Sequence, residues 1–154
     1  MFRLFEAPFR GSTIRRWPGA RPSGVARTHW IDDVLSESLR KGIEQLVILG
    51  AGYDSRPYRM AGLDSARVFE VDHPATSASK QKRLAGIVSS NVTYVRLDFD
   101  KDDLGAALAN AGFNLDRQTF LLWEGVTNYL TEDAVDMTLR YISGAKPGSL
   151  LLFT

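Results

Sequence analysis

Residues 46–54 read LVILGAGYD, four aliphatic residues followed at once by a glycine-containing loop, and this stretch decides the fold. A short apolar run of this kind is typical of a strand buried on both faces of a parallel sheet. Gly50 and Gly52 permit a tight turn and the close approach of a ligand to the backbone. A helix after the loop would add free N–H groups and the positive end of its dipole. The stretch therefore predicts the first strand and the ligand-binding loop of an α/β domain.

Further strands and helices alternate along the rest of the chain. The sequence predicts strands over residues 67–71, 92–97, 119–123 and 149–153, and helices over residues 74–84, 102–111 and 131–143. An earlier helix is predicted from Ile31, Val34, Leu35 and Leu39, with Gly42 near its end. Strands separated by helix-length segments favour right-handed βαβ units and a parallel sheet.

Length and composition exclude several classes of protein. The 154 residues suit one domain, and the 44% of hydrophobic residues are enough for a sizeable core. The chain has no cysteine and only two histidines, His29 and His73, so we expect no disulfide framework and no metal site. No apolar run is long enough for a transmembrane helix, and we expect a cytoplasmic protein with no membrane partner.

The first 27 residues differ in charge from the rest, with six arginines and one acidic residue. We expect residues 1–23 to form a basic, poorly ordered N-terminal arm ahead of one domain over residues 24–154. A basic arm on an acidic body could also touch nucleic acid or acidic lipid. We expect no nucleic-acid partner, and the role of the arm stays open.

Two acidic residues follow the second and third predicted strands. Asp72 lies 20 residues after Gly52, where a carboxylate can accept hydrogen bonds from both ribose hydroxyls of an adenosine-type cofactor. The alternative is an acid that caps the helix beginning at Pro74. Asp98 could accept from an adenine amino group while the backbone of Phe99 contacts the ring edge, or it could be an ordinary loop carboxylate.

The type of cofactor is indicated by the residues after the glycines. The dinucleotide-binding fingerprint has a third glycine or an alanine at the position where this chain has Ser55. Asp54, taken as an exposed acid beside the loop, would repel a diphosphate and suits a cofactor with a cationic sulfonium or ammonium. These residues favour S-adenosyl-L-methionine over a nicotinamide dinucleotide.

Five segments together resemble the leucine carboxyl methyltransferase family, whose bacterial members are described as polyketide-type O-methyltransferases. The segments are GVART at 24–28, LGAGYDSR at 49–56, FEVDHP at 69–74, WEGVTNYLT at 123–131 and KPGS at 146–149. The resemblance covers residues 24–154 in order. It implies a class I methyltransferase with a Rossmann-like, doubly wound parallel sheet of about five strands in the order 3-2-1-4-5, lacking the family's last two strands.

The resemblance also implies a set of cofactor-binding residues. Its members are the carboxylate-binding Arg27, the glycine loop of Gly50, Ala51 and Gly52, the ribose-binding Asp72, the adenine-facing Asp98 and Phe99, and Glu124 near the cofactor's amino group. Glu70 is expected to support rather than contact the cofactor. His73 is expected to face away from the reacting methyl group. Tyr129 either lines the acceptor side or packs.

The implied activity is methyl transfer from S-adenosyl-L-methionine to a carboxylate or hydroxyl of a small-molecule or peptide acceptor, with no catalytic residue assigned. Family members are about twice as long, so we expect a truncated chain that carries the cofactor-binding half. Two alternatives stay open: a non-catalytic remnant that keeps the cofactor-binding fold, and a nicotinamide-dependent oxidoreductase. The apolar strand at 149–153 would leave an exposed edge, which could support self-association.

Overall fold

The computed structural model describes residues 20–87 and 91–154, which divide between Val34 and Leu35 into two compact units. Of the first unit, the structure describes residues 20–34, which lie in helix α2 (Ala20–Arg40). Most of the predicted N-terminal arm lies outside the described residues, but its last four residues are helical rather than irregular. The boundary between residues 23 and 24 stays a prediction. Helix α2 ends before Gly42, whose φ of +98° is typical of a residue that follows a helix.

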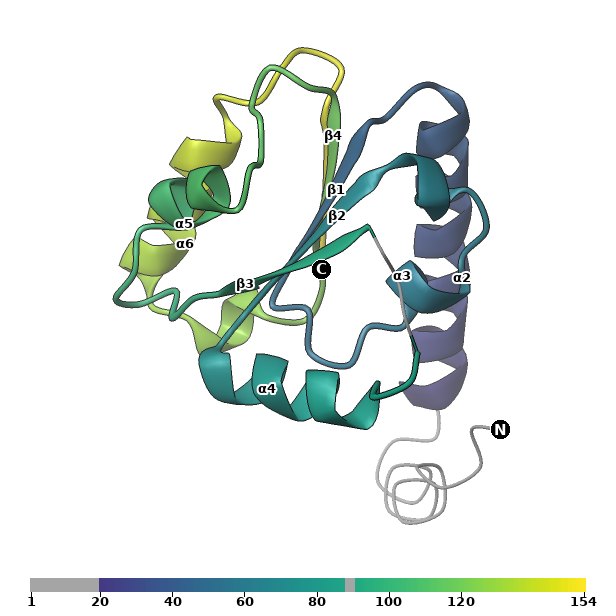
Figure 1. Ribbon diagram of the computed structural model, residues 1–154, viewed down its shortest axis with the longest axis horizontal. Helices are drawn as coiled ribbons and strands as arrows, with labels where there is room; N and C mark the ends of the chain where they lie inside the picture. Colours follow the sequence, from purple (N-terminus) through teal and green to yellow (C-terminus); the bar gives the residue numbers. More distant parts are fainter. Residues whose placement is uncertain (1–19, 88–90) are drawn as a thin grey trace. The chain divides into compact units, whose positions relative to one another are not determined.

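The second unit contains a five-stranded sheet, and its strand order β3-β2-β1-β4-β5 confirms the predicted order 3-2-1-4-5. Every pairing is parallel. The strands are β1 (Gln45–Leu49), β2 (Arg67–Asp72), β3 (Val92–Arg96), β4 (Thr119–Trp123) and β5 (Leu150–Phe153) (Figure 1). Strands β2 and β3 lie on one side of β1, and strands β4 and β5 lie on its other side. The order therefore reverses between β1 and β4, which is where α/β sheets bind ligands.

Helices pack on both faces of this sheet. They are α3 (Arg56–Arg59), α4 (Pro74–Arg83), α5 (Leu104–Asn110) and α6 (Glu132–Ile142), with short 3₁₀ turns η1 (Leu63–Ser65) and η2 (Thr127–Tyr129). Figure 1 shows α5 and α6 together on one face and α3 on the other. Lys80 of α4 pairs with Glu70 of β2, whereas the neighbouring Phe69 and Val71 face α5 and α6. Because side chains alternate along a strand, α4 covers the face opposite to α5 and α6.

The main hydrophobic core lies between the sheet and the pair α5 and α6. The rings of Phe69 and Phe113 meet edge to face, with centroids 5.5 Å apart. Gly105 lets the two helices approach, because a Cβ there would lie 2.9 Å from the Tyr141 ring. The buried members of this core are Val47, Leu49, Phe69, Val71, Val95, Leu97, Phe99, Leu104, Leu108, Phe113, Leu121, Trp123 and Ile142.

Strand burial follows position in the sheet. All five residues of β1 and of β4 are buried, as the continuous apolar runs predict for central strands. The outer strands β3 and β5 are only partly buried. In β5, Leu150 and Phe153 are 45% and 62% exposed.

Local polar contacts explain where the observed elements differ slightly from those predicted. Strand β1 begins at Gln45, a polar residue, because its buried amide donates to the Asn114 carbonyl and to the Thr119 hydroxyl. Helices α5 and α6 begin one residue after Asp103 and Thr131, whose side chains cap them by accepting from Ala106 and Ala134 N–H groups. In the part of the chain that is described, no helix is long and apolar enough to cross a membrane.

Candidate functional site

The loop after β1 is held against the end of β2. The N–H groups of Gly50 and Ala51 both donate to the Val71 carbonyl, at 2.8 and 3.0 Å. Gly50 has a φ of +67°, and a Cβ at this position would lie 2.9 Å from Cγ1 of Val126 and closer still to Cγ2. The loop therefore needs glycine at position 50 both for its backbone conformation and for the packing of Val126.

Asp72 ends β2 and joins it to the glycine loop. Its Oδ2 accepts from the Gly52 N–H at 2.6 Å, and its Oδ1 accepts from the His73 N–H at 2.7 Å. The side chain that caps α4 is that of His73, whose Nδ1 accepts from the Ala75 N–H. Asp72 therefore does not cap α4. Each of its oxygens keeps a lone-pair direction for a further donor, since a carboxylate offers about four acceptor sites.

The carboxylate of Asp98, after β3, is engaged within its own loop. Lys101 Nζ lies 2.6 Å from Oδ2, and the Asp100 N–H donates to Oδ1. The hydrogen bond from Lys101 lowers the pKa of Asp98. The contact to adenine predicted for Asp98 would have to share this carboxylate with Lys101, an exposed side chain on the same loop.

The side chain of Phe99 points into the core rather than into the loop cluster. It is 8% exposed and lines a cavity of about 370 Å³ between α5 and α6, together with Leu97 and Tyr141. Burial and the nearby Asp103 carboxylate raise the pKa of Tyr141. Because the Phe99 ring is occupied in packing, any contact of this residue with a cofactor would come from its backbone, as the sequence predicts.

Glu124, which follows β4, lies beside a buried arginine that the sequence analysis had not assigned to the site. Arg56 Nη1 is 3.1 Å from Glu124 Oε2 and 2.6 Å from Asp54 Oδ2. The Arg56 backbone N–H also donates to Asp54 Oδ1 at 2.8 Å. The side chains of Arg56 and Asp54 are 4% and 12% exposed. The expectation that Asp54 is an exposed, uncompensated acid is therefore wrong.

The helix expected after the glycine loop is present but very short. Helix α3 has four residues, and its preceding residue Ser55 makes no capping bond. A macrodipole grows with the number of aligned peptide units, so the predicted dipole contribution at this loop is small. The Arg56 guanidinium also lies at this position, where Asp54 and Glu124 both contact it.

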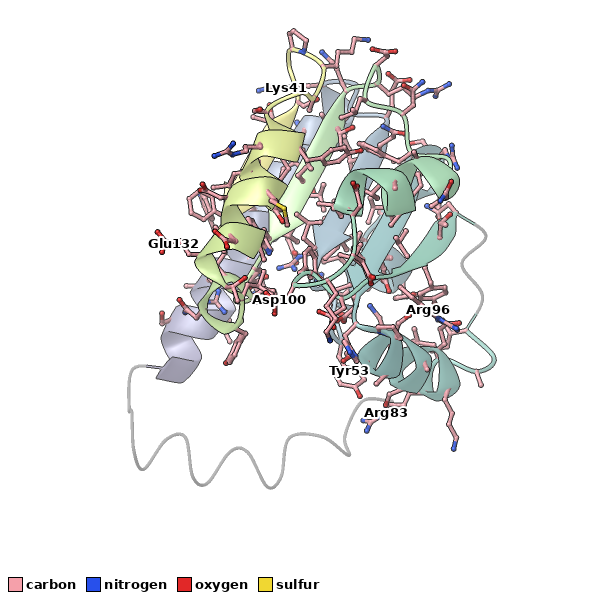
Figure 2. The ribbon with its side chains drawn as sticks, turned by 90° about the vertical axis from the view of Figure 1, so that its left-hand side faces the viewer. Lys41, Tyr53, Arg83, Arg96, Asp100 and Glu132 are labelled. Carbon is pink, nitrogen blue, oxygen red and sulfur yellow. The ribbon has the colours of Figure 1, made fainter. Side chains whose placement is uncertain are left out.

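Tyr53, at the tip of the loop, is tied to α4. Its hydroxyl lies 3.0 Å from Ser79 Oγ, and the Arg83 guanidinium stands 4.9 Å from the ring centroid. Figure 2 shows Tyr53 and Arg83 side by side at one end of the molecule. These contacts connect the loop after β1 with α4, as the Asp72 bond connects it with β2.

A buried polar cluster lies beneath the loops, on the α3 and α4 face of the sheet. Glu70 and Lys80 meet at 2.8 Å with side chains 2% and 5% exposed, at an angle unfavourable for a hydrogen bond. The Tyr58 and Tyr94 hydroxyls share a bond of 2.7 Å. Burial raises the pKa of Glu70, and Lys80 opposes that rise without cancelling it. Burial also raises the pKa of Tyr58, with the Tyr94 hydroxyl adding to the effect. This placement agrees with the supporting position expected for Glu70.

The structure thus brings some of the predicted site residues together and leaves others apart. Gly50, Ala51 and Gly52 lie directly against the end of β2 that Asp72 terminates, and Arg56 links Asp54 with Glu124. Arg27 belongs to the first unit and is described only within α2. Tyr129 is 83% exposed, so it does not pack in the core. Among the residues described, no group of three His, Asp or Glu side chains could hold a metal ion.

Val126 is a member of this cluster that the sequence analysis did not single out, and Arg56 is one that the sequence leaves open between surface charge and a support for nearby acids. Arg56 stands two residues from Asp54 in a loop where arginine is equally compatible with the surface. Its role depends on Glu124, which is 68 residues away in sequence. A usable signal existed in the pairing of a strand-end acid with an unassigned arginine, because a carboxylate that is partly removed from solvent is stabilised by a cationic partner.

Relatives with similar sequences are described as methyltransferases. A protein of Streptomyces coelicolor is 38% identical over 135 residues, covering 82% of this chain and 47% of the relative. A protein of Mycobacterium tuberculosis is 39% identical over 140 residues, covering 88% of this chain and 43% of the relative. Both are described as candidate S-adenosyl-L-methionine-dependent methyltransferases. The chain thus spans less than half the length of these relatives.

Solved structures of low sequence identity share the fold. An O-methyltransferase family protein from Burkholderia thailandensis superposes with a TM-score of 0.57 at 14% identity, covering 82% of this chain and 37% of that one. The apo form of the S-adenosylmethionine-dependent methyltransferase SibL gives 0.54 at 16% identity, covering 92% and 41%. These likenesses establish the α/β architecture.

The family is shown by the sequence match. The model of the leucine carboxyl methyltransferase family matches residues 3–143, which is most of the chain and contains four of the five segments that indicated the resemblance; KPGS at 146–149 lies beyond the match. The chain belongs to the leucine carboxyl methyltransferase family.

Proposed function

We propose that this chain binds S-adenosyl-L-methionine at the carboxyl edge of its sheet and serves the transfer of a methyl group to an oxygen of an acceptor. The observation that carries the proposal is the Asp72 carboxylate, which is fixed by the Gly52 N–H and the His73 N–H and can accept further hydrogen bonds. A carboxylate held in this way at the end of β2 suits the two hydroxyls of a ribose.

The donor groups present fit this cofactor. Gly50 and Gly52 let the loop lie close to the methionine portion, and Asp72 would accept from the ribose hydroxyls. The Asp98 loop and the Phe99 backbone would contact the adenine. Glu124 would face the amino group. The role of Arg27 in binding the carboxylate through its guanidinium fork stays a prediction from the family resemblance.

The charge near the loop supports S-adenosyl-L-methionine over a nicotinamide dinucleotide. Asp54 and Glu124 share one guanidinium, so this group of three side chains carries a net negative charge. A net negative site favours a sulfonium and an ammonium and disfavours a diphosphate. Ser55 also stands where the dinucleotide fingerprint needs glycine or alanine.

The bound cofactor would supply the reactive methyl group, and the residues of the chain would supply position and exclusion of water. Holding both reactants in line can contribute about 7–11 kcal/mol of the barrier, so no protein nucleophile is required. A carboxylate acceptor needs no base, whereas a hydroxyl acceptor would benefit from one. The His73 ring caps α4 through Nδ1, so we assign it no role in proton transfer.

The proposal extends to oxygen as the methyl-accepting atom, in a carboxylate or a hydroxyl of a small molecule or a peptide, and to a cytoplasmic site of action. The support for an oxygen acceptor is that the family is named for carboxyl methylation. Incubating the full chain with labelled S-adenosyl-L-methionine and candidate acids, phenols and amines would separate oxygen from nitrogen methylation. Transfer to amines alone would contradict oxygen as the acceptor.

Calorimetry with S-adenosylhomocysteine is the primary test of the binding proposal. We expect saturable binding by the folded full chain of 154 residues. A folded sample that binds NADH but not S-adenosylhomocysteine would favour the oxidoreductase alternative. A chain that binds S-adenosylhomocysteine but transfers no methyl group would be a remnant that keeps the cofactor-binding fold, an alternative that the short span relative to its relatives keeps open.

We also propose that the outer edge of β5 supports self-association. Among the residues described, β5 pairs only with β4, and Leu150 and Phe153 are exposed on it. An exposed apolar edge strand is a template for pairing with another chain. Sedimentation should show a concentration-dependent dimer that Phe153→Lys shifts to monomer. A monomer at all concentrations would contradict this proposal.

A further inference from the structure

We infer that Arg56 is a positioning residue that holds the Glu124 carboxylate oriented toward the amino group of the bound cofactor. This inference rests on the proposed function, because it assigns the subsite that would receive the amino group. It starts from a juxtaposition of three charged side chains, Asp54, Arg56 and Glu124, at the point where the strand order reverses between β1 and β4.

The first step concerns location. Asp54 and Arg56 follow β1, and Glu124 follows β4, and these two strands pair directly, with Ile48 opposite Leu122. One nitrogen, Arg56 Nη1, lies 2.6 Å from Asp54 and 3.1 Å from Glu124. The guanidinium therefore links the loops that border the crevice in which such sheets bind their ligands.

The second step concerns burial. The Arg56 side chain is 4% exposed, whereas that of Glu124 is 20% exposed. The arginine is therefore the more deeply buried of the two, and part of the glutamate side chain stays exposed. A guanidinium that is almost wholly buried is kept in place by its ion pairs, which are much less screened by solvent than exposed ones.

The third step concerns charge. Two carboxylate oxygens contact the same nitrogen, so they lie close to each other. Two carboxylates at such a separation disfavour each other's ionisation unless a cation stands between them. Arg56 Nη1 supplies a cation that contacts both acids, so the two carboxylates stay beside each other. An ammonium group on the ligand would add a further cation beside these acids.

The role of Arg56 is therefore distinct from a general stabilising role for the loop. If it acts through Glu124, its loss should weaken only ligands that carry the amino group. 5′-Methylthioadenosine provides the comparison, because it keeps the adenosine and the thioether but lacks the amino and carboxylate groups of S-adenosylhomocysteine. A purely structural role would weaken both ligands alike.

The experiment is calorimetric titration of the full chain and its variants with both ligands. Arg56→Gln should weaken S-adenosylhomocysteine at least about tenfold, the usual effect of losing a charge-assisted contact. It should leave 5′-methylthioadenosine within about twofold. Arg56→Lys should fall between, since lysine keeps the charge without the guanidinium fork. Arg59→Gln, on the same short helix but at an exposed position, is the matched control and should change neither affinity.

A double-mutant cycle gives an independent measurement with S-adenosylhomocysteine alone. In a Glu124→Gln background, Arg56→Gln should cost little further affinity, because its effect passes through Glu124. Additive losses, equal weakening of both ligands, or an unchanged affinity in Arg56→Gln would each overturn the inference. Failure of the unmodified chain to bind S-adenosylhomocysteine would instead overturn the proposed function. Thermal unfolding of each variant separates loss of binding from loss of folding.

Discussion

The Gly52 N–H donates a 2.6 Å hydrogen bond to Oδ2 of Asp72, which joins the loop after β1 to the end of β2. Asp72→Ala removes this bond together with the proposed ribose acceptor. We expect the affinity for S-adenosylhomocysteine to fall by about tenfold or more. Calorimetry measures the change, and Asp64→Asn, an exposed acid in η1 before β2, is the control that should have no effect. Unchanged binding by Asp72→Ala would remove the ribose assignment.

Gly50 is the glycine whose replacement should cost the most stability. Gly50→Ala imposes a left-handed φ on alanine and drives its Cβ into Val126, whereas Gly86→Ala, with φ of +94° and open space, imposes only the first penalty. We expect Gly86→Ala to lose about 1 kcal/mol and Gly50→Ala about 2–4 kcal/mol of unfolding free energy. Urea unfolding measures the free energy of unfolding of both variants. Equal losses would show that the Val126 side chain moves aside without an energetic cost.

The buried pair of Glu70 and Lys80 should behave as a unit. Lys80→Met leaves the Glu70 carboxylate buried without its counter-charge, and we expect a loss of about 3–5 kcal/mol at neutral pH. The double variant Glu70→Leu with Lys80→Met should recover most of that loss, because no uncompensated charge remains. Chemical unfolding of the single and double variants measures the coupling. A double variant as unstable as Lys80→Met would mean that the pair contributes more than charge compensation.

The raised pKa of Glu70 gives a pH dependence with a definite sign. Burial makes its ionisation less favourable in the folded chain than in the unfolded one, where the pKa is near 4.5. The stability that the Glu70 carboxyl contributes to the folded chain is therefore fully present below pH 4.5. It is lost as the pH rises through the pKa of Glu70 in the folded chain. Glu70→Gln mimics the protonated form, so its stability relative to the unmodified chain should increase with pH. Urea titrations from pH about 4 to 8 test this, and a difference that does not change with pH would contradict it.

The positions and buried character of the strands could be predicted because they depend on local patterns, whereas the strand order was implied by the family resemblance. The apolar runs of β1 and β4 are continuous, and both strands prove buried along their whole length. The parallel pairing also follows, since strands separated by helices allow few arrangements. Element ends were less predictable. Gln45 joins β1 only because Asn114 and Thr119, far away in sequence, satisfy its amide.

The candidate site was predictable to the extent that strand ends converge. Asp72 was identified because it lies at the carboxyl end of a strand, whereas Glu124 was assigned through the family resemblance. The compensation of Asp54 could not be read from the sequence, since an arginine two residues away is as compatible with solvent as with burial. The 4% exposure of that arginine and its contact with Glu124 depend on how the two loops pack.

The sequence by itself determined the succession of strands and helices and the family, and the resemblance to that family implied the strand order, because apolar periodicity and motif spacing are carried by neighbouring residues. Only the tertiary structure decided which charges meet. Ionic contacts act over a few ångströms of space regardless of separation along the chain, so the bridge from Asp54 through Arg56 to Glu124 exists only once β1 and β4 have paired.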